Sequence, residues 1–154
     1  IITDVHVDQF LDLNDLVFAR QKIKVPVKRE YIKNLDRACL KRKCRKIFVA
    51  VDQNGKHHAG VYLIWDEHSA YYLLGGGDPK YRNSGATSLC IWSAIKFASS
   101  VTKSFDFEGS MIEPVERFVR GFGAAQTPYL LISRTTSKLF RTKLLLLELL
   151  KCLK

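Results

Sequence analysis

The chain has 154 residues, of which 47% are apolar and 26% charged, so its composition excludes a wholly disordered protein. Lysine and arginine number 25 against 15 acidic residues, and the formal charge of +10 favours an anionic partner such as phosphate, nucleic acid or an anionic surface. No run of residues approaches the roughly 20 apolar residues of a membrane span, and no signal-peptide pattern precedes the first helix.

Cysteine usage and the N-terminus set the expected context. The four cysteines are irregularly spaced in a chain that is neither short nor loop-rich, which predicts reduced thiols and a cytoplasmic location. A metal site would have to pair Cys39 and Cys44 with His57 and His58, but the chain has no CxxC pair, so no metal site is predicted. The chain starts at Ile1 and contains a single methionine. We expect one domain over residues 1–154, the C-terminal part of a longer protein.

The first half of the chain changes from a helical to a strand period. Apolar residues at helical spacing predict helices over 7–22 and 28–43. Strands are predicted at 46–52, 59–65 and 70–74. The first two strands are separated by Asn54-Gly55, a strong hairpin signal. Three consecutive strands with short turns predict an antiparallel meander.

The second half begins with a sharp break at Gly75-Gly76-Gly77-Asp78-Pro79. Residues 85–100 then predict a helix that is apolar on nearly all sides, and therefore buried, and 104–108 a short strand. Pro114 suits the first turn of another helix, and a strand is expected at 127–133. The third strand, the buried helix and the short strand form a β-α-β crossover. The prediction is an α/β (α+β) fold with a mixed, mainly antiparallel sheet and helices on both faces.

A leucine-rich amphipathic helix is predicted at 137–153. Its two apolar stripes make a wide face that needs a partner. We expect that partner to be the core of this domain, with a second domain or subunit, or a membrane surface, as alternatives.

The segment from residue 75 to residue 87 is the leading candidate for a binding site, because it lies where a strand feeds the first turn of a buried helix. Exposed backbone N–H groups at a helix start attract phosphate or a developing oxyanion. A flexible turn with an N-cap at Ser84 is the alternative. The candidate donor-binding residues here are Gly75, Gly76, Lys80, Arg82, Asn83, Ser84, Gly85, Ala86 and Thr87.

The run Arg82-Asn83-Ser84-Gly85-Ala86-Thr87 resembles the Arg/Gln-x-x-Gly-x-Gly/Ala signature of the GNAT acyltransferase superfamily, with Thr87 in place of the usual Gly or Ala. In that superfamily the signature joins the fourth strand to the third helix and cradles a pyrophosphate. The element order also matches through residue 133. The resemblance implies a GNAT-like fold and acyl-CoA as a co-substrate, with no tightly bound cofactor.

A narrower resemblance starts at Phe105-Asp106-Phe107-Glu108-Gly109-Ser110 and continues in Phe118-Val119-Arg120-Gly121-Phe122-Gly123. This is similar to the strand–Gly–helix and Phe-Lys-x-Gly-Phe-Gly pattern of the FemABX-like aminoacyl transferases. That branch moves amino acids from charged tRNA to bacterial cell-wall precursors and contains two GNAT-like units. It implies tRNA and a second GNAT-like domain as partners, with Arg120 replacing the family's basic contact.

Acyl transfer to an amine needs a fixed donor, a neutral amine and a stabilised oxyanion. Glu108 is the candidate base, directly or through water, and Asp106 is the second candidate. An ion pair with Arg117 or Arg120 is the alternative role of Glu108. Many GNAT enzymes place a proton-donating Tyr where this chain has Arg117, and Tyr129 is a candidate substitute or a half-buried strand aromatic.

The basic cluster Lys41-Arg42-Lys43 with Arg45-Lys46 ends the second predicted helix. It is interpreted as a solvated helix C-terminus or as a contact to a tRNA backbone or phosphorylated acceptor. Together these features predict an N-acyl or aminoacyl transferase acting on an amine. A catalytically silent phosphate- or RNA-binding module, or a partner-docking domain, is the alternative.

Overall fold

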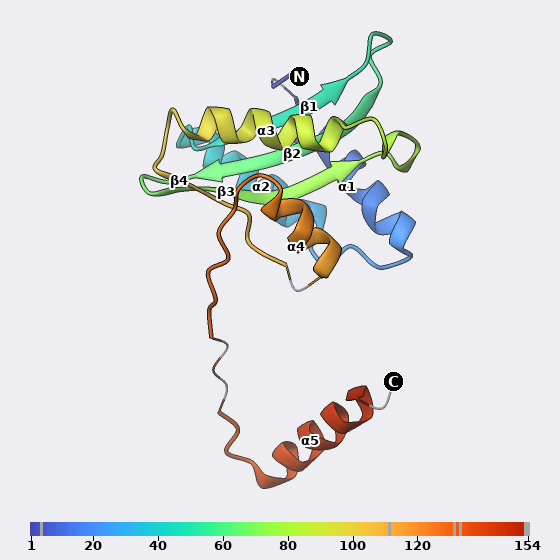
Figure 1. The fold of residues 1–154 in the computed structure, drawn as a ribbon, viewed down its shortest axis with the longest axis vertical. Coiled ribbons are helices and arrows are strands. Elements are labelled where there is room, and N and C mark those ends of the chain that lie inside the picture. Colours follow the sequence, from blue (N-terminus) through green and yellow to red (C-terminus); the bar gives the residue numbers. More distant parts are fainter. Residues whose placement is uncertain (4, 111, 131, 133, 153–154) are drawn as a thin grey trace.

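A computed structural model describes residues 1–3, 5–110, 112–130, 132 and 134–152, with side chains up to residue 147 (Figure 1). The elements in chain order are the helices α1 (Val7–Gln21) and α2 (Arg29–Lys41), the strands β1 (Arg45–Val51), β2 (His57–Trp65) and β3 (Ser69–Gly77), the short 3-10 helix η1 (Pro79–Tyr81), α3 (Ala86–Ala98), β4 (Ser104–Asp106), α4 (Glu113–Arg120) and α5 (Lys138–Cys152).

The described strands form one four-stranded sheet in the order β1-β2-β3-β4. The first three pair antiparallel and β4 pairs parallel to β3, which confirms both the predicted meander and the predicted β-α-β crossover. Helix α3 covers one face of the sheet and α1 and α2 cover the other (Figure 1). The predicted mixed, mainly antiparallel sheet with helices on both faces is therefore confirmed.

Two apolar clusters, one on each face, hold the sheet between its helices. Alternate residues of β1 point to opposite faces. Phe48 and Ala50 accordingly join Cys90 and Ile91 of α3, whereas Ile47 and Val49 join residues of α1 and α2 on the other face. Strands covered on both faces are apolar almost throughout, which is why the strand signal in this part of the sequence is strong.

The three glycines at 75–77 belong to β3, so the prediction that they interrupt the strand is wrong. Gly75, Gly76 and Gly77 pair in register with β2. A Cβ on Gly76 would lie 2.8 Å from the Asn14 backbone nitrogen and 2.9 Å from Leu13, so glycine lets α1 pack directly on the strand. Close packing of α1 on β3 therefore accounts for the glycine at position 76.

The edge of β3 that faces away from β2 is open over its second half. Strand β4 pairs only with Ser69–Tyr71. The pairing of β2 with β3 shifts by one residue between Tyr62 and Leu63, which leaves Leu73 as an extra residue in a bulge. From Tyr72 onward, no strand of the described residues pairs with this edge of β3, and the opening beside it positions the candidate site.

A buried polar group fastens α2 to the sheet. The Asp36 carboxylate lies 2.8 Å from Arg45 Nε and accepts a 2.8 Å hydrogen bond from the Tyr62 hydroxyl. Burial, followed by the nearby Asp36, raises the pKa of Tyr62. Arg45 is therefore committed to a structural ion pair, and this part of the basic cluster is not a free contact for an anionic partner.

The C-terminal expectations are met only for the helix. The described residues 127–130 and 132 form no strand, and Leu131 and Ser133 lie outside the described residues. Helix α5 forms where it was predicted, but Figure 1 shows it apart from the sheet at the end of an extended segment. Its leucines between 139 and 147 are exposed, so the predicted packing onto this domain's core is wrong.

Candidate functional site

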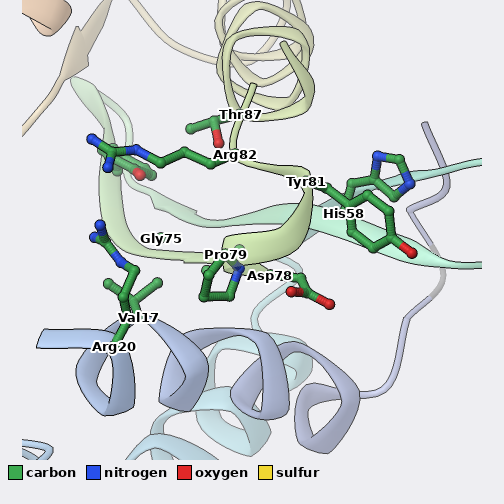
Figure 2. A pocket seen from close by; sticks show the side chains of 12 residues that line it. Val17, Arg20, His58, Gly75, Asp78, Pro79, Tyr81, Arg82 and Thr87 are labelled. Atoms are coloured by element: carbon green, nitrogen blue, oxygen red, sulfur yellow. The ribbon is translucent and has the colours of Figure 1, made fainter. Parts of the chain in front are cut away.

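The open edge of β3 borders a cleft of about 360 Å³, a size typical of small-molecule sites. Helix α1 forms one wall, and η1 with the start of α3 forms the other (Figure 2). The cleft is lined by Val17, Arg20, His58, Tyr72, Gly75, Gly76, Gly77, Asp78, Pro79, Tyr81, Arg82 and Thr87.

Main-chain groups of β3 face this cleft. The Asp78 N–H donates to the His58 carbonyl at 2.9 Å, so the backbone N–H of Asp78 points toward β2. Because backbone groups alternate in direction along an antiparallel pair, Gly75 and Gly77 point away from β2. The Asn14 side-chain amide donates to the Gly75 carbonyl at 2.6 Å, which agrees with this direction. The Gly75 and Gly77 N–H groups are thus available to a ligand that runs along the strand.

The turn into α3 provides a second set of N–H groups. The N–H of Ala86 is taken by the Ser84 hydroxyl at 3.3 Å and that of Leu89 by the Gly85 carbonyl at 3.0 Å. In the described part of the chain no acceptor is found for the N–H groups of Asn83, Gly85, Thr87 or Ser88. Gly85 has φ of 74° and open space where a Cβ would be, so a ligand can approach its backbone. This is the geometry that binds anions at helix N-termini.

Tyr72 also lines the cleft, beside the amides of β3. Tyr72 packs at right angles to Phe107, with 6.4 Å between ring centroids. Its hydroxyl lies directly over Gly75, where a Cβ would come within 2.2 Å of the oxygen. Burial raises the pKa of Tyr72 to about 12, so the phenol remains protonated at neutral pH and can donate a hydrogen bond.

Side chains of β2 and the β1–β2 turn brace the loop before α3. The rings of His58 and Tyr81 stack in parallel at 3.8 Å. The two His58 nitrogens lie 3.4 Å from the Ser84 hydroxyl and 3.4 Å from Asp52. The backbone N–H of Lys56, followed by that of Asn54 and by His58, lowers the pKa of the Asp52 carboxyl. The loop is therefore held by side chains beyond its own segment.

The structure brings part of the predicted donor site together. Gly75, Gly76, Arg82 and Thr87 line the cleft. Lys80, Asn83, Ser84 and Gly85 are exposed on the adjoining loop, and Ala86 is buried against the α3 face of the sheet, where it can offer only its backbone. The predicted N-cap at Ser84 is off by one residue, since Gly85 occupies that position.

The predicted catalytic residues lie outside the cleft lining. Asp106, at the end of β4, accepts a 2.7 Å hydrogen bond from the Glu108 N–H, and Glu108 is exposed with φ of 61°. Arg117 pairs with Glu113, and Arg120 pairs with Glu116, so the predicted ion pair of Glu108 with either arginine is wrong. In each pair the two residues are four positions apart on α4, a spacing that brings their side chains together on one face of the helix.

Two further predicted residues also lie away from the cleft. Arg120 is on α4, where its guanidinium is taken by Glu116. Tyr129 is 85% exposed in the extended segment, so it is neither in the cleft nor a half-buried strand aromatic.

Sequence reasoning missed Tyr72, His58 and Arg20 as lining residues. The bulge at Leu73 breaks the alternation along β3, so the facing of Tyr72 could not be read by counting residues. His58 and Arg20 approach from elements far away in the sequence, and no local motif marks them. Their convergence follows from the packing of α1 and β2 against β3.

The model of the acetyltransferase (GNAT) domain family matches residues 3–110, which include the whole sheet, α3 and the cleft. The chain belongs to this family. The open edge of β3 and the turn into α3 are thus features of a GNAT domain, and the superfamily resemblance of the sequence is confirmed.

Solved structures share this GNAT fold at low sequence identity. A candidate acetyl transferase from Pyrococcus furiosus is 15% identical, with a TM-score of 0.65 over 84% of this chain and 94% of that one. An aminoglycoside acetyltransferase from an uncultured soil metagenomic sample, solved with sisomicin, is 16% identical, with a TM-score of 0.60 over 85% and 90% of the two chains. An aminoglycoside 6'-N-acetyltransferase from Acinetobacter baumannii is 12% identical, with a TM-score of 0.62 over 88% and 99%. A search of curated protein sequences finds no match.

Over the described ranges, no three His, Cys, Asp or Glu side chains gather in a way that could hold a metal ion. None of the helices, as far as the structure describes them, is both long and apolar enough to cross a membrane.

Proposed function

We propose that the domain transfers an acyl group, with acetyl as the simplest case, from a coenzyme A thioester to an amine. Two sets of main-chain N–H groups carry this proposal, at Gly75 and Gly77 on the open edge of β3 and at the turn into α3, and neither set has an acceptor among the described residues. A long donor with amide groups in its middle and phosphates at one end fits these two sets. Membership in the acetyltransferase family supports the same donor.

The phosphates would lie at the turn into α3. The N–H groups of Asn83, Gly85 and Thr87 face outward there, and the helix start carries partial positive charge. Arg82 lines the same part of the cleft and has no carboxylate within ion-pair distance among the described residues. Arg82 adds a full positive charge that a pyrophosphate would neutralise.

The acyl end would lie along β3, near the bulge. Gly75 and Gly77 offer N–H groups to the amides of the donor, and the Tyr72 hydroxyl lies above Gly75. We propose that Tyr72 donates a hydrogen bond to the thioester carbonyl as negative charge develops on its oxygen. A protonated phenol in a partly enclosed site suits this task, since the hydrogen bond strengthens in the transition state.

The reaction also has to remove a proton from the attacking amine. The nitrogen attacks the carbonyl carbon, the C–S bond breaks, and the sulfur leaves as a thiolate that takes up a proton. We propose Glu108 as the acceptor of the amine proton, with Asp106 as the second candidate, in each case through water because neither lines the cleft.

Aminoacyl-tRNA is a second candidate donor, and with it a cell-wall precursor as the acceptor. The feature that favours it is the Phe118–Gly123 sequence, which resembles the FemABX-like branch and forms α4 and the following turn. With either donor, the proposed site of action is the cytoplasm. A binding domain without activity would keep the affinity for phosphate and transfer nothing.

The test compares donors and variants in the longest soluble form of the protein. Acetyl-CoA should raise the melting temperature progressively as its concentration rises above its Kd, whereas an aminoacyl-tRNA mimic should not. Arg82→Ala and Gly85→Val should abolish this shift and the transfer of acetyl to amines, and Arg37→Ala, an exposed change on α2, should retain both. Full activity in both cleft variants would show that the donor binds elsewhere.

A further inference from the structure

The acidic side chains of α1 form ion pairs, whereas the arginine in its last turn does not. Arg29 Nη2 lies 2.8 Å from Asp12 and 2.6 Å from Asp15, and Lys33 Nζ lies 3.0 Å from Asp8. The three described carboxylates of α1 are therefore used by α2. Arg20, in the last turn, has no carboxylate within ion-pair distance in the part of the chain that the structure describes.

Arg20 and Arg82 approach the same cleft from opposite walls. Arg20 rises from α1 and Arg82 comes from the loop before α3, and Figure 2 shows both guanidinium groups on the Gly75 side of the cleft. Asp78 is the one carboxylate in the cleft lining, and Figure 2 shows it turned to the other side. Its oxygen accepts a 2.9 Å hydrogen bond from the Lys80 N–H, so it serves the local turn.

Two unpaired guanidinium groups at one opening repel each other and are stabilised by anions. A donor held at the start of α3 would place its phosphates against Arg82, whereas Arg20 lies on the opposite wall of the cleft, on α1. Arg20 therefore faces the part of the cleft that remains for the acceptor. The loop that follows it carries Lys22, Lys24 and Lys28, all exposed and without a carboxylate partner among the described residues.

We propose that the acceptor of this acyltransferase is an amine that also carries an anionic group, and that Arg20 binds this group. The inference rests on the proposed function and specifies its substrate class. A guanidinium forms paired, charge-assisted hydrogen bonds with either a carboxylate or a phosphate. The same positive charge disfavours polycationic amines, the class to which aminoglycosides belong, by direct repulsion.

The experiment uses four small amines of similar size and different charge with acetyl-CoA as the donor. These are β-alanine (carboxylate), O-phosphoethanolamine (phosphate), β-alaninamide (neutral) and 1,3-diaminopropane (second cation). The anionic amines should have kcat/KM values about tenfold or more above that of the neutral amine, and the dication the lowest value. β-Alanine and O-phosphoethanolamine are measured separately, so the larger kcat/KM identifies whether a carboxylate or a phosphate is preferred.

Variants assign the preference to one residue. Arg20→Gln should reduce kcat/KM for the anionic amines about tenfold or more, through KM, and leave the neutral amine unchanged. The affinity for acetyl-CoA, measured by calorimetry, should stay within twofold of the wild type. Arg37→Gln, an exposed charge loss on α2, is the matched control and should change neither value.

The outcomes separate the two proposals. If acetyl-CoA binds but the amines show no charge preference, or if Arg20→Gln weakens acetyl-CoA instead of the anionic amine, the acceptor inference is wrong and the proposed function stands. If acetyl-CoA does not bind and no amine is acetylated, the proposed function fails and the acceptor inference fails with it.

Discussion

The contact between Tyr72 and Gly75 can be tested with a double-mutant cycle. In Gly75→Ala the new Cβ would lie 2.2 Å from the Tyr72 hydroxyl oxygen, so the ring must move by about 1 Å to reach ordinary contact. Overpacking of this kind costs about 1–3 kcal/mol in the free energy of unfolding. In Tyr72→Phe the oxygen is gone, and the nearest ring carbon would lie 3.2 Å from the Cβ, which needs a shift of only a few tenths of an ångström.

Urea unfolding of the wild type, the two single variants and the double variant measures this coupling. The cost of Gly75→Ala should fall by about 1–2 kcal/mol when Tyr72 is already phenylalanine, as expected for residues in direct contact. Additive free energies would refute the placement of the hydroxyl over Gly75, and with it the proposed position of the hydrogen-bond donor in the cleft.

Two further predictions concern stability. Gly76→Ala should lower the free energy of unfolding by about 1–3 kcal/mol, because its Cβ would meet the α1 backbone near Leu13. Gly77→Ala is the control: the nearest atom to its Cβ would be 3.5 Å away, so the same urea titration should show a change of less than about 1 kcal/mol. Because folding raises the pKa of Tyr62, the native state binds more protons than the unfolded state above pH 10.0, and stability should fall as the pH rises past that value. Tyr62→Phe should flatten this decline of stability with pH. At neutral pH the same variant should lose about 1–3 kcal/mol in the free energy of unfolding, because buried Asp36 loses a hydrogen bond. If the decline at alkaline pH is unchanged in Tyr62→Phe, groups other than Tyr62 cause it.

Local pattern predicts those parts of the fold in which burial and backbone preference agree. The alternation Ile47-Phe48-Val49-Ala50 marks a strand covered on both faces, and the apolar helix α3 marks the layer that covers one of them. The prediction that α3 is buried on nearly all sides is wrong, because Leu89 and Trp92 on its outer side are about half exposed. The meander and the crossover follow from these elements because short turns and right-handed connections leave few other arrangements.

The errors arise where tertiary packing decides. Gly75–Gly77 look like a loop in sequence, but the close approach of α1 requires glycine inside the strand at Gly76. Residues 127–133 have strand composition, yet composition does not supply a neighbouring strand with which to pair. The face of α5 was assigned to this domain's core although nothing in an amphipathic pattern identifies which surface it covers.

For the site, the loop motif predicts the turn into α3 but not the wall opposite it. Arg82 and Thr87 belong to the motif and line the cleft as expected. Arg20 and His58 come from α1 and β2, and they reach the cleft only because the sheet brings distant segments to one edge. Glu108 was assigned from its place after a strand, and the structure puts it beyond the cleft lining.

The most direct measurement of the central claim is a ¹⁵N–¹H NMR titration of the protein with acetyl-CoA. The largest shifts are expected at the backbone amides of Gly75, Gly77, Gly85 and Thr87, with little change at Gly55, a distant turn glycine. Saturable binding that leaves those four amides unmoved, or shifts only amides outside the cleft, would contradict the assignment of this edge of β3 as the donor site.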